Sequence, residues 1–207
     1  MNCLIAGASG LVGQSLLSEL LADESVHSVT VFARKPLKTL HPKLKTILLS
    51  FDQLETIVLP AADTAFCCLG STLKKAGSKE AFFKVDHDYV MSFAKGCFNV
   101  GVKTFVVVSA IGADENSKIF YNQVKGKTDA DLKTIGFQKL KILHPSLLLG
   151  ERDEARPLEK LAQYAAPLFG KLMVGPLAPY RPIKASQVAK QMKAAAFNGG
   201  QSSALDD

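Results

Sequence analysis

Three polar residues in the second half of the chain have the types and the spacing that proton transfer to a carbonyl oxygen requires. Ser109 ends the apolar run TFVVVS, Tyr121 follows twelve residues later, and Lys125 comes four residues after Tyr121. A phenol can donate such a proton, but its ordinary pKa of about 10 is high, and a neighbouring ammonium lowers it. A serine hydroxyl can orient the oxygen that receives the proton. The same tyrosine and lysine also suit the solvent-facing side of a helix, so the surrounding elements must decide between the two interpretations.

Short apolar runs alternate with longer helical patterns along the chain. We expect strands at residues 2–6, 28–33, 45–49, 64–68, 104–109 and 140–149. We expect helices at 11–22, 79–100, 117–134, 154–169 and 185–197, with a weaker candidate at 52–58. The strands are continuously apolar, as strands buried on both faces are. The alternation predicts a doubly wound parallel α/β sheet of the Rossmann type, built as one domain over 1–207 with 150–198 as a short C-terminal, substrate-side segment.

This architecture gives the three polar residues a common place. Ser109 falls at the carboxyl end of a strand, where ligands bind in open parallel sheets. A helix over 117–134 places Tyr121 and Lys125 on one face, one turn apart. We therefore predict that Ser109, Tyr121 and Lys125 form a catalytic set, with Lys125 also binding the ribose of a nicotinamide.

Three glycines follow the first expected strand. Gly7, Gly10 and Gly13 lie in LIAGASGLVGQSLL and open the first expected helix. A tight turn needs dihedrals that glycine adopts easily, and a pyrophosphate must approach bare backbone before the helix N–H groups can hold it. We predict a dinucleotide-binding loop, with a glycine-rich turn without ligand as the alternative. A P-loop does not fit, because Gln14 stands where that loop needs Lys.

Basic residues follow the second expected strand, where an NAD site normally has an acidic one. Residues 28–50 contain no Asp or Glu, and VFARKPL places Arg34 and Lys35 just past the strand. A guanidinium can grip a 2′-phosphate with two hydrogen bonds, so the sequence favours NADP(H) over NAD(H). A solvated basic loop is the alternative. Asp52, after the third strand, is placed either to accept from the adenine amino group or to cap a helix.

The composition is that of a globular protein with free thiols. The chain has 207 residues, is 47% hydrophobic and carries a net charge of +6. Its 25 basic residues are spread along the chain and form no nucleic-acid-binding arm. The four cysteines and four histidines show no metal-ligand spacing. Without a recognisable signal peptide or membrane span, we expect a cytoplasmic protein with no bound metal.

The glycine spacing G-x-x-G-x-x-G resembles that of extended and atypical short-chain dehydrogenases/reductases. Together with the strand-end serine and Y-x-x-x-K, three stretches narrow the resemblance: FCCLGSTLKKAGSKEAFFKVDHDYV, SAIGADENSKIFYNQVKGKTD and YRPIKASQVAKQM. They are similar to the atypical branch that contains the HIV Tat-interactive protein family of tumour-suppressor oxidoreductases and its bacterial relatives. The resemblance covers nearly the whole chain.

The resemblance implies a set of cofactor contacts. The residues that it assigns to the cofactor are Gly7, Ser9, Gly10, Leu11, Val12, Arg34 and Lys35. It places Cys68, Leu69, Gly70 and Ser71 beneath the adenosine and ribose, and Tyr121 and Lys125 beside the nicotinamide. The stretch LHPSLLLGERDEARP would close the site; the family usually has Arg-Pro there, whereas this chain has His144-Pro145.

The C-terminal segments should supply the pocket for a small substrate, or share it with a partner chain. Arg152, Arg156 and Arg181 are candidates for contacting an anionic substrate, although ERDEARPLEK also carries four acids and suits a solvated helix start. Two functions remain open: an NADP(H)-dependent oxidoreductase, and a non-enzymatic NADP(H)-binding regulator that acts through a protein partner. The intact Ser109, Tyr121 and Lys125 favour the enzyme. A scaffold without nucleotide conflicts with both the glycine loop and the basic pair Arg34 and Lys35. The sequence indicates neither the substrate nor the oligomeric state.

Overall fold

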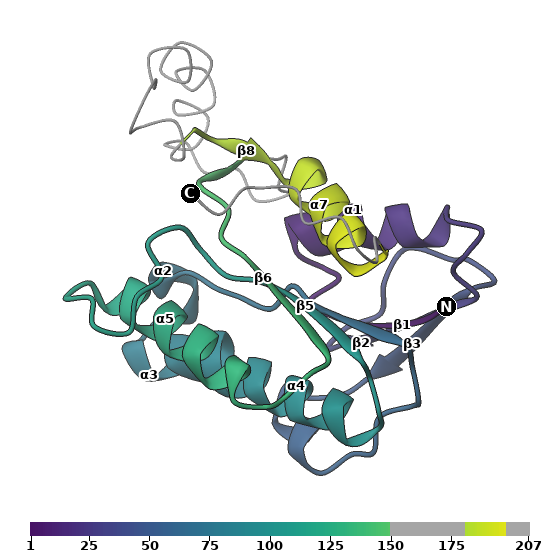
Figure 1. Ribbon diagram of the computed structural model, residues 1–207, viewed down its shortest axis with the longest axis horizontal. Helices are drawn as coiled ribbons and strands as arrows, with labels where there is room; N and C mark the ends of the chain where they lie inside the picture. The colour runs from purple at the N-terminus through teal and green to yellow at the C-terminus, as the bar shows by residue number, and fades with distance from the viewer. Residues whose placement is uncertain (150–180, 198–207) are drawn as a thin grey trace.

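A six-stranded parallel sheet forms the centre of the computed structural model, which describes residues 1–149 and 181–197 (Figure 1). The order across the sheet is β3-β2-β1-β4-β5-β6, so the direction of winding reverses between β1 and β4. In such sheets ligands bind outside the carboxyl ends of the strands at the reversal. The strands are β1 (Asn2–Ala6), β2 (Ser28–Ala33), β3 (Leu44–Leu48), β4 (Thr64–Cys67), β5 (Thr104–Val108) and β6 (Lys139–Leu143). The predicted doubly wound Rossmann sheet is confirmed.

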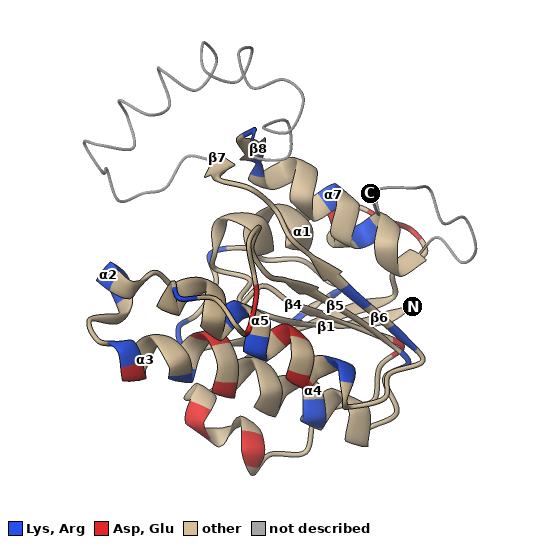
Figure 2. Ribbon diagram, turned by 60° about the vertical axis from the view of Figure 1, so that its left-hand side comes forward, with Lys and Arg blue, Asp and Glu red and all other residues tan. Residues whose placement is uncertain are grey.

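Helices cover both faces of the sheet, each over its own hydrophobic core. On one face α1 (Leu11–Leu21) packs against α7 (Ala185–Phe197), and Leu16, Val188 and Met192 are fully buried between them and the sheet. On the other face lie η1 (Phe51–Glu55), a short 3₁₀ helix, α4 (Tyr89–Asn99) and α5 (Phe120–Lys133). Figure 2 shows charged residues of both signs along α5, on the side of the sheet opposite to α1 and α7.

The predicted helix over 79–100 is helical throughout but changes its winding. It runs as α3 (Lys79–Phe83), a π-helical turn η2 (Lys84–Asp88) and α4. Such wide turns occur mostly as single insertions in α-helices, often beside functional sites. The short helix α2 (Leu73–Ala76) had no predicted counterpart. The weaker candidate at 52–58 is the 3₁₀ helix η1, and the predicted helix at 154–169 lies outside the described residues.

The single strand predicted over 140–149 was wrong. Strand β6 ends at Leu143, and β7 (Leu148–Leu149) pairs instead with β8 (Ile183–Lys184) in a separate two-stranded sheet. Pro145 explains the break, because proline has no N–H to donate to a strand ladder. Its carbonyl instead accepts a hydrogen bond from the amide of Ile111, which holds the chain beside the loop after β5.

Two of the three glycines after β1 are required by packing alone. Gly7 has a φ of +88°, and a Cβ there would lie 2.4 Å from the carbonyl carbon of Cys68. A Cβ on Gly13 would lie 2.2 Å from the carbonyl oxygen of Gly7. These distances are shorter than any real contact, so the turn after β1 sits directly against both the start of α1 and the loop after β4. The fold therefore demands these glycines whether or not a ligand binds.

We expect Gly13→Ala to destabilise the protein, because the added methyl group must push backbone aside. Overpacking of this kind costs about 1–3 kcal/mol, measured as the loss in free energy of unfolding in urea. Gly10→Ala is the control, since its Cβ would meet only the Gly7 carbonyl oxygen at an ordinary 3.4 Å. Equal losses for the two variants would contradict the packing explanation.

Candidate functional site

A pocket of about 360 Å³ lies at the carboxyl ends of β1, β4 and β5, where the sheet reverses its winding. This volume is within the range of small-molecule sites, about 300–1,000 Å³. Eleven of the predicted site residues line it: Ser9, Gly10, Leu11, Val12, Cys68, Leu69, Gly70, Ser71, Ser109, Tyr121 and Lys125. Segments far apart in the sequence, predicted separately as a phosphate loop and as a catalytic set, thus form one cavity.

The start of α1 forms one wall of this pocket and presents unpaired amides. Its N-cap residue, Gly10, offers no side-chain cap, and the amides of Leu11 and Val12 belong to the first turn, which has no intrahelical acceptors. A Cβ on Gly10 would meet nothing closer than 3.4 Å, so a ligand can approach the backbone there. A helix start with bare backbone is suited to a phosphate group. This cradle fits the pyrophosphate of a dinucleotide.

A buried ion pair forms the opposite wall. The ammonium of Lys125 on α5 lies 2.7 Å from Oδ1 of Asp86, which stands in the π-turn η2. The other carboxylate oxygen, Oδ2, accepts a hydrogen bond of 2.7 Å from the amide of Ser71. Asp86 is fully buried, and burial raises the pKa of its carboxyl. Burial lowers the pKa of Lys125, but Asp86 and, after it, Tyr121 raise it, so the net pKa lies above the ordinary value and the lysine stays charged.

Tyr121 is half-buried beside this ion pair. Its ring packs against Phe82 with the centroids 5.4 Å apart. Burial raises the pKa of the phenol, the Lys125 ammonium lowers it, and the Asp86 carboxylate raises it again, so the net pKa lies above the ordinary value. The ammonium thus acts in the predicted direction, but burial and Asp86 outweigh it.

Ser109 lines the pocket, but its proton is directed into the protein. Its hydroxyl donates to Oδ2 of Asp129 at 3.0 Å, and the same oxygen is 2.7 Å from Nε2 of His144. An ionised carboxylate only accepts hydrogen bonds, so the Ser109 hydroxyl is the donor in this contact and its oxygen keeps its acceptor capacity. His144 stands where the resemblance expects arginine, and it pairs with the Asp129 carboxylate on α5.

The residues predicted to contact the 2′-phosphate and the adenine, Arg34, Lys35 and Asp52, do not line the pocket. Arg34 and Lys35 are exposed just past β2, on the same edge of the sheet as the turn after β1, and the Arg34 guanidinium carbon lies 5.7 Å from the centre of the Phe51 ring. Asp52 is exposed, and its carboxylate is held by Lys84 at 2.6 Å and by the hydroxyl of Tyr89 at 3.0 Å. Ser50, rather than Asp52, caps η1. The roles of these residues toward a cofactor stay predictions.

Little of the predicted substrate side falls within the described residues. Arg152 and Arg156 lie outside them. Arg181 is exposed at the start of the second described range, where its carbonyl accepts a hydrogen bond from the Ser146 hydroxyl, and it does not line the pocket. Within 1–149 and 181–197, no group of His, Cys, Asp or Glu side chains could hold a metal ion, and no helix could cross a membrane.

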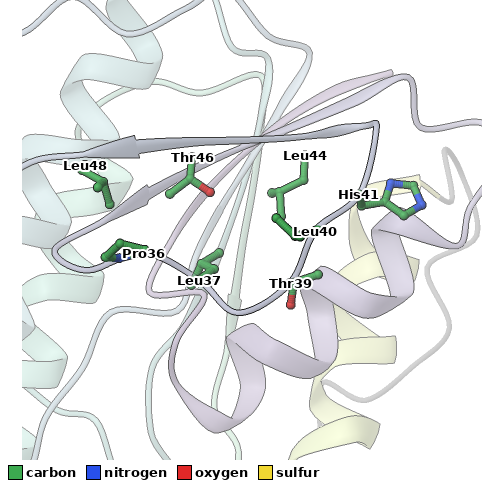
Figure 3. Close-up of a pocket in the computed structure, with 8 residues that line it drawn as sticks. All are labelled: Pro36, Leu37, Thr39, Leu40, His41, Leu44, Thr46 and Leu48. Carbon is green, nitrogen blue, oxygen red and sulfur yellow. The ribbon is translucent and has the colours of Figure 1, made fainter.

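A second hollow lies at the edge strand β3, away from these residues (Figure 3). Its volume is about 280 Å³, and it lies between β3 and the connection from β2. Leucine, threonine, proline and a single histidine, His41, line it. Figure 3 shows Leu37, Leu40 and Leu44 grouped between the strand and the connection. None of the predicted site residues contributes to it.

Three functional residues were missed from the sequence. Asp129 lies four residues after Lys125 and eight after Tyr121, so the same helical spacing could have found it. A Cβ on Gly126 would lie 2.1 Å from the amide nitrogen of Glu115, so this glycine lets α5 touch the loop after β5. Asp86 gave no signal, because neither its burial nor the π-turn that carries it is visible in the pattern KVDHDYV.

Comparison with known proteins gives consistent matches. Residues 7–139 match the model of a family described as NAD(P)H-binding. The chain is 36% identical to protein HTATIP2 of Rattus norvegicus, over 83% of this chain and 71% of the relative. It is 32% identical to "protein fmp52, mitochondrial" of Emericella nidulans, over 83% of this chain and 77% of the relative. That name leaves a cytoplasmic location for this chain a prediction.

Solved structures show the same fold. The human epimerase family protein SDR39U1 (isoform 2), crystallised with NADPH, has a TM-score of 0.67 at 18% identity, covering 95% of this chain and 70% of that one. A UDP-glucose 4-epimerase of Thermotoga maritima, crystallised with UDP-glucose, has a TM-score of 0.70 at 17% identity, covering 96% and 74%.

We expect Asp129→Asn to destabilise the protein, because it weakens the hydrogen bonds from Ser109 and His144 to a buried carboxylate. Hydrogen bonds to a charged group contribute about 1.5–3 kcal/mol, measured as free energy of unfolding. Asp131→Asn is the matched control. Asp131 also pairs with a histidine, His87, but its side chain is 34% exposed, against 10% for that of Asp129. We therefore expect the control to lose only about 0–1 kcal/mol of stability. A larger loss for the control would refute this account.

Proposed function

The chain belongs to the NAD(P)H-binding, atypical short-chain dehydrogenase/reductase family, as its sequence predicted, and from that premise we propose that it is an NADP(H)-dependent oxidoreductase acting on a small carbonyl or alcohol. One observation carries the proposal: the uncapped start of α1 and the Tyr121–Lys125 pair line the same pocket. A phosphate cradle and a proton donor in one cavity are the two parts that hydride chemistry on a carbonyl needs.

Different residues would bind different parts of the cofactor. The amides of Leu11 and Val12 would hold the pyrophosphate at the positive end of α1. Lys125 would reach the nicotinamide ribose from the far wall, and Arg34 and Lys35 would meet the 2′-phosphate at the end of β2. No carboxylate follows β2 before Asp52, and Asp52 is already paired with Lys84. This charge pattern favours NADP(H) over NAD(H). When bound, the cofactor supplies or accepts a hydride.

Tyr121 moves the proton. In the reducing direction its hydroxyl gives a proton to the substrate oxygen as the carbonyl becomes an alcohol, and Lys125 stabilises the phenolate that remains. Water at the mouth of the pocket returns the proton to Tyr121. The Ser109 hydroxyl donates its hydrogen bond to Asp129. Its oxygen accepts a hydrogen bond from the alcohol and so orients it. Tyr121 and Ser109 are the catalytic residues in this scheme.

The rival function is an NADP(H)-binding regulator that performs no turnover and acts through a protein partner. It predicts the same cofactor contacts but gives no role to a half-buried phenol beside a charged lysine. Titration with NADPH and NADH separates both functions from a scaffold. A screen of carbonyl substrates then separates the enzyme from the regulator.

We expect Tyr121→Phe to keep the affinity for NADPH and to lower turnover by about 10²–10⁴-fold, the usual contribution of a positioned general acid. The measurement is steady-state oxidation of NADPH with any carbonyl substrate found, beside a fluorescence titration of NADPH binding. Tyr89→Phe is the control, because its hydroxyl bonds Asp52 outside the pocket. Unchanged turnover in Tyr121→Phe would remove Tyr121 as the proton donor.

We expect Arg34→Ala to weaken NADPH binding by about 10- to 100-fold, the loss of about 1.5–3 kcal/mol from a charge-assisted hydrogen bond, and to leave NADH binding nearly unchanged. Fluorescence titrations with the two cofactors measure the difference. Lys38→Ala, another exposed basic residue of the same connection, is the control for a general effect of charge. An equal loss for NADPH and NADH would exclude Arg34 as the 2′-phosphate contact.

A further inference from the structure

The carboxylate of Asp86 is a fixed negative charge inside the pocket that the proposed chemistry does not itself require. We propose that Asp86 is a positioning residue: it takes Lys125 as its counter-ion, keeps Tyr121 in its protonated form, and so sets the site for carbonyl reduction rather than alcohol oxidation. The preferred direction rests on the proposed function. The state of Tyr121 does not rest on that function, because it follows from the buried Asp86–Lys125 pair in the pocket that Tyr121 lines.

The position of Asp86 is fixed by several contacts at once. Its side chain is fully buried, Oδ1 lies 2.7 Å from the Lys125 ammonium, and Oδ2 accepts from the Ser71 amide. Its main-chain carbonyl accepts a hydrogen bond of 3.0 Å from Thr128 on α5. No donor is aligned with Oδ1 in hydrogen-bond geometry, so the charge of Lys125 is what balances this oxygen. Both carboxylate oxygens are thus engaged, one by the Lys125 ammonium and the other by the Ser71 amide.

The charges around the phenol decide its protonation state. Three groups meet at this wall: Asp86 from η2, and Tyr121 and Lys125 from α5. Cys67 on β4 also faces them, but burial raises the pKa of its thiol to about 12 and leaves it neutral. Lys75 is the remaining charged side chain lining the pocket among the described residues, and it is exposed. With Asp86 and Lys125 ionised the wall is neutral, and a phenolate would add an uncompensated charge.

Removing the Asp86 charge reverses this balance. Tyr121 would then be the main remaining charge partner of Lys125, and a phenolate beside an ammonium would be a neutral pair. The present arrangement holds the pKa of Tyr121 above its ordinary value, through burial and then Asp86, against the opposing effect of Lys125. At physiological pH the resting site therefore holds a proton to give. Oxidation of an alcohol needs the phenolate as proton acceptor and should be favoured only at high pH.

The ionisation of Tyr121 can be measured without any substrate. The chain has four tyrosines and no tryptophan, so subtracting the phenolate absorbance titration of Tyr121→Phe from that of the parent protein isolates Tyr121. We expect its pKa above about 10, the ordinary value, in the parent, and at least tenfold greater acidity in Asp86→Asn. Asp88→Asn, an exposed carboxylate two residues further on that pairs with His87, is the matched control and should leave Tyr121 unchanged.

A second variant guards against loss of folding, because removing one partner of a buried ion pair is strongly destabilising. A Cβ on Gly70 would lie 3.3 Å from Oδ1 of Asp86 and 3.6 Å from the Lys125 ammonium, so Gly70→Ala should disturb the pair while keeping both charges. We expect it to shift the Tyr121 titration in the same direction by a smaller amount. A parent Tyr121 that titrates at or below its ordinary pKa, or a pKa that fails to fall in Asp86→Asn, would overturn the proposal.

Turnover then tests the consequence for direction. With a substrate pair in hand, Asp86→Asn should raise the ratio of kcat for oxidation to kcat for reduction at a fixed pH of about 8. It should also shift the pH profile of kcat for oxidation to lower pH. If no substrate is turned over, the proposed function fails while the titration still decides the role of Asp86. If turnover occurs and the titration does not shift, the enzyme stands and the role of Asp86 falls.

Discussion

The burial of the Asp86 carboxylate is the constraint that joins the elements around the pocket. Taking a carboxylate out of water costs several kcal/mol even after the surroundings relax, so the position is stable only if its partners are held in place. Those partners come from α5, through Lys125, and from the loop after β4, through the Ser71 amide. The same requirement therefore fixes α5, the π-turn and this loop relative to one another, and with them the pocket wall.

The π-turn makes this constraint compatible with the packing of a long helix. Each residue of an α-helix advances the side chains by about 100°, so one inserted residue turns every later side chain to a new face. Phe82 and Asp86 face α5 and the pocket, whereas Val90 and Phe93 on α4 are buried against the sheet. In an uninterrupted α-helix, positions 82, 86, 90 and 93 would all fall on roughly one stripe. The unusual winding is thus a local solution to two demands, a buried charge and a hydrophobic face.

Local patterns predicted the fold and most of the pocket, because strands buried on both faces and residues one helical turn apart follow from short-range geometry. For that reason the predicted set of Ser109, Tyr121 and Lys125 lines a single cavity. The patterns failed where long-range contacts decide. The continuous apolar run 140–149 does not reveal that the strand ends before Pro145, whose carbonyl accepts a hydrogen bond from the Ile111 amide. The burial of Asp86 depends on Lys125, which is 39 positions away. Asp129 accepts the hydrogen bond that we had expected Ser109 to donate to the ligand.

The glycines and the charges of this pocket do not argue for function equally. Gly7 and Gly13 are required by backbone contacts of the fold, so a protein that had lost its ligand would still need them. The Asp86–Lys125 pair is different, because replacing a buried ion pair by well-packed apolar residues is often neutral or stabilising by about 1–4 kcal/mol. Packing gives no reason to keep two charges and a phenol at the wall of a cavity. The proposed chemistry on a bound molecule would give such a reason, whereas a scaffold of the same fold gives none.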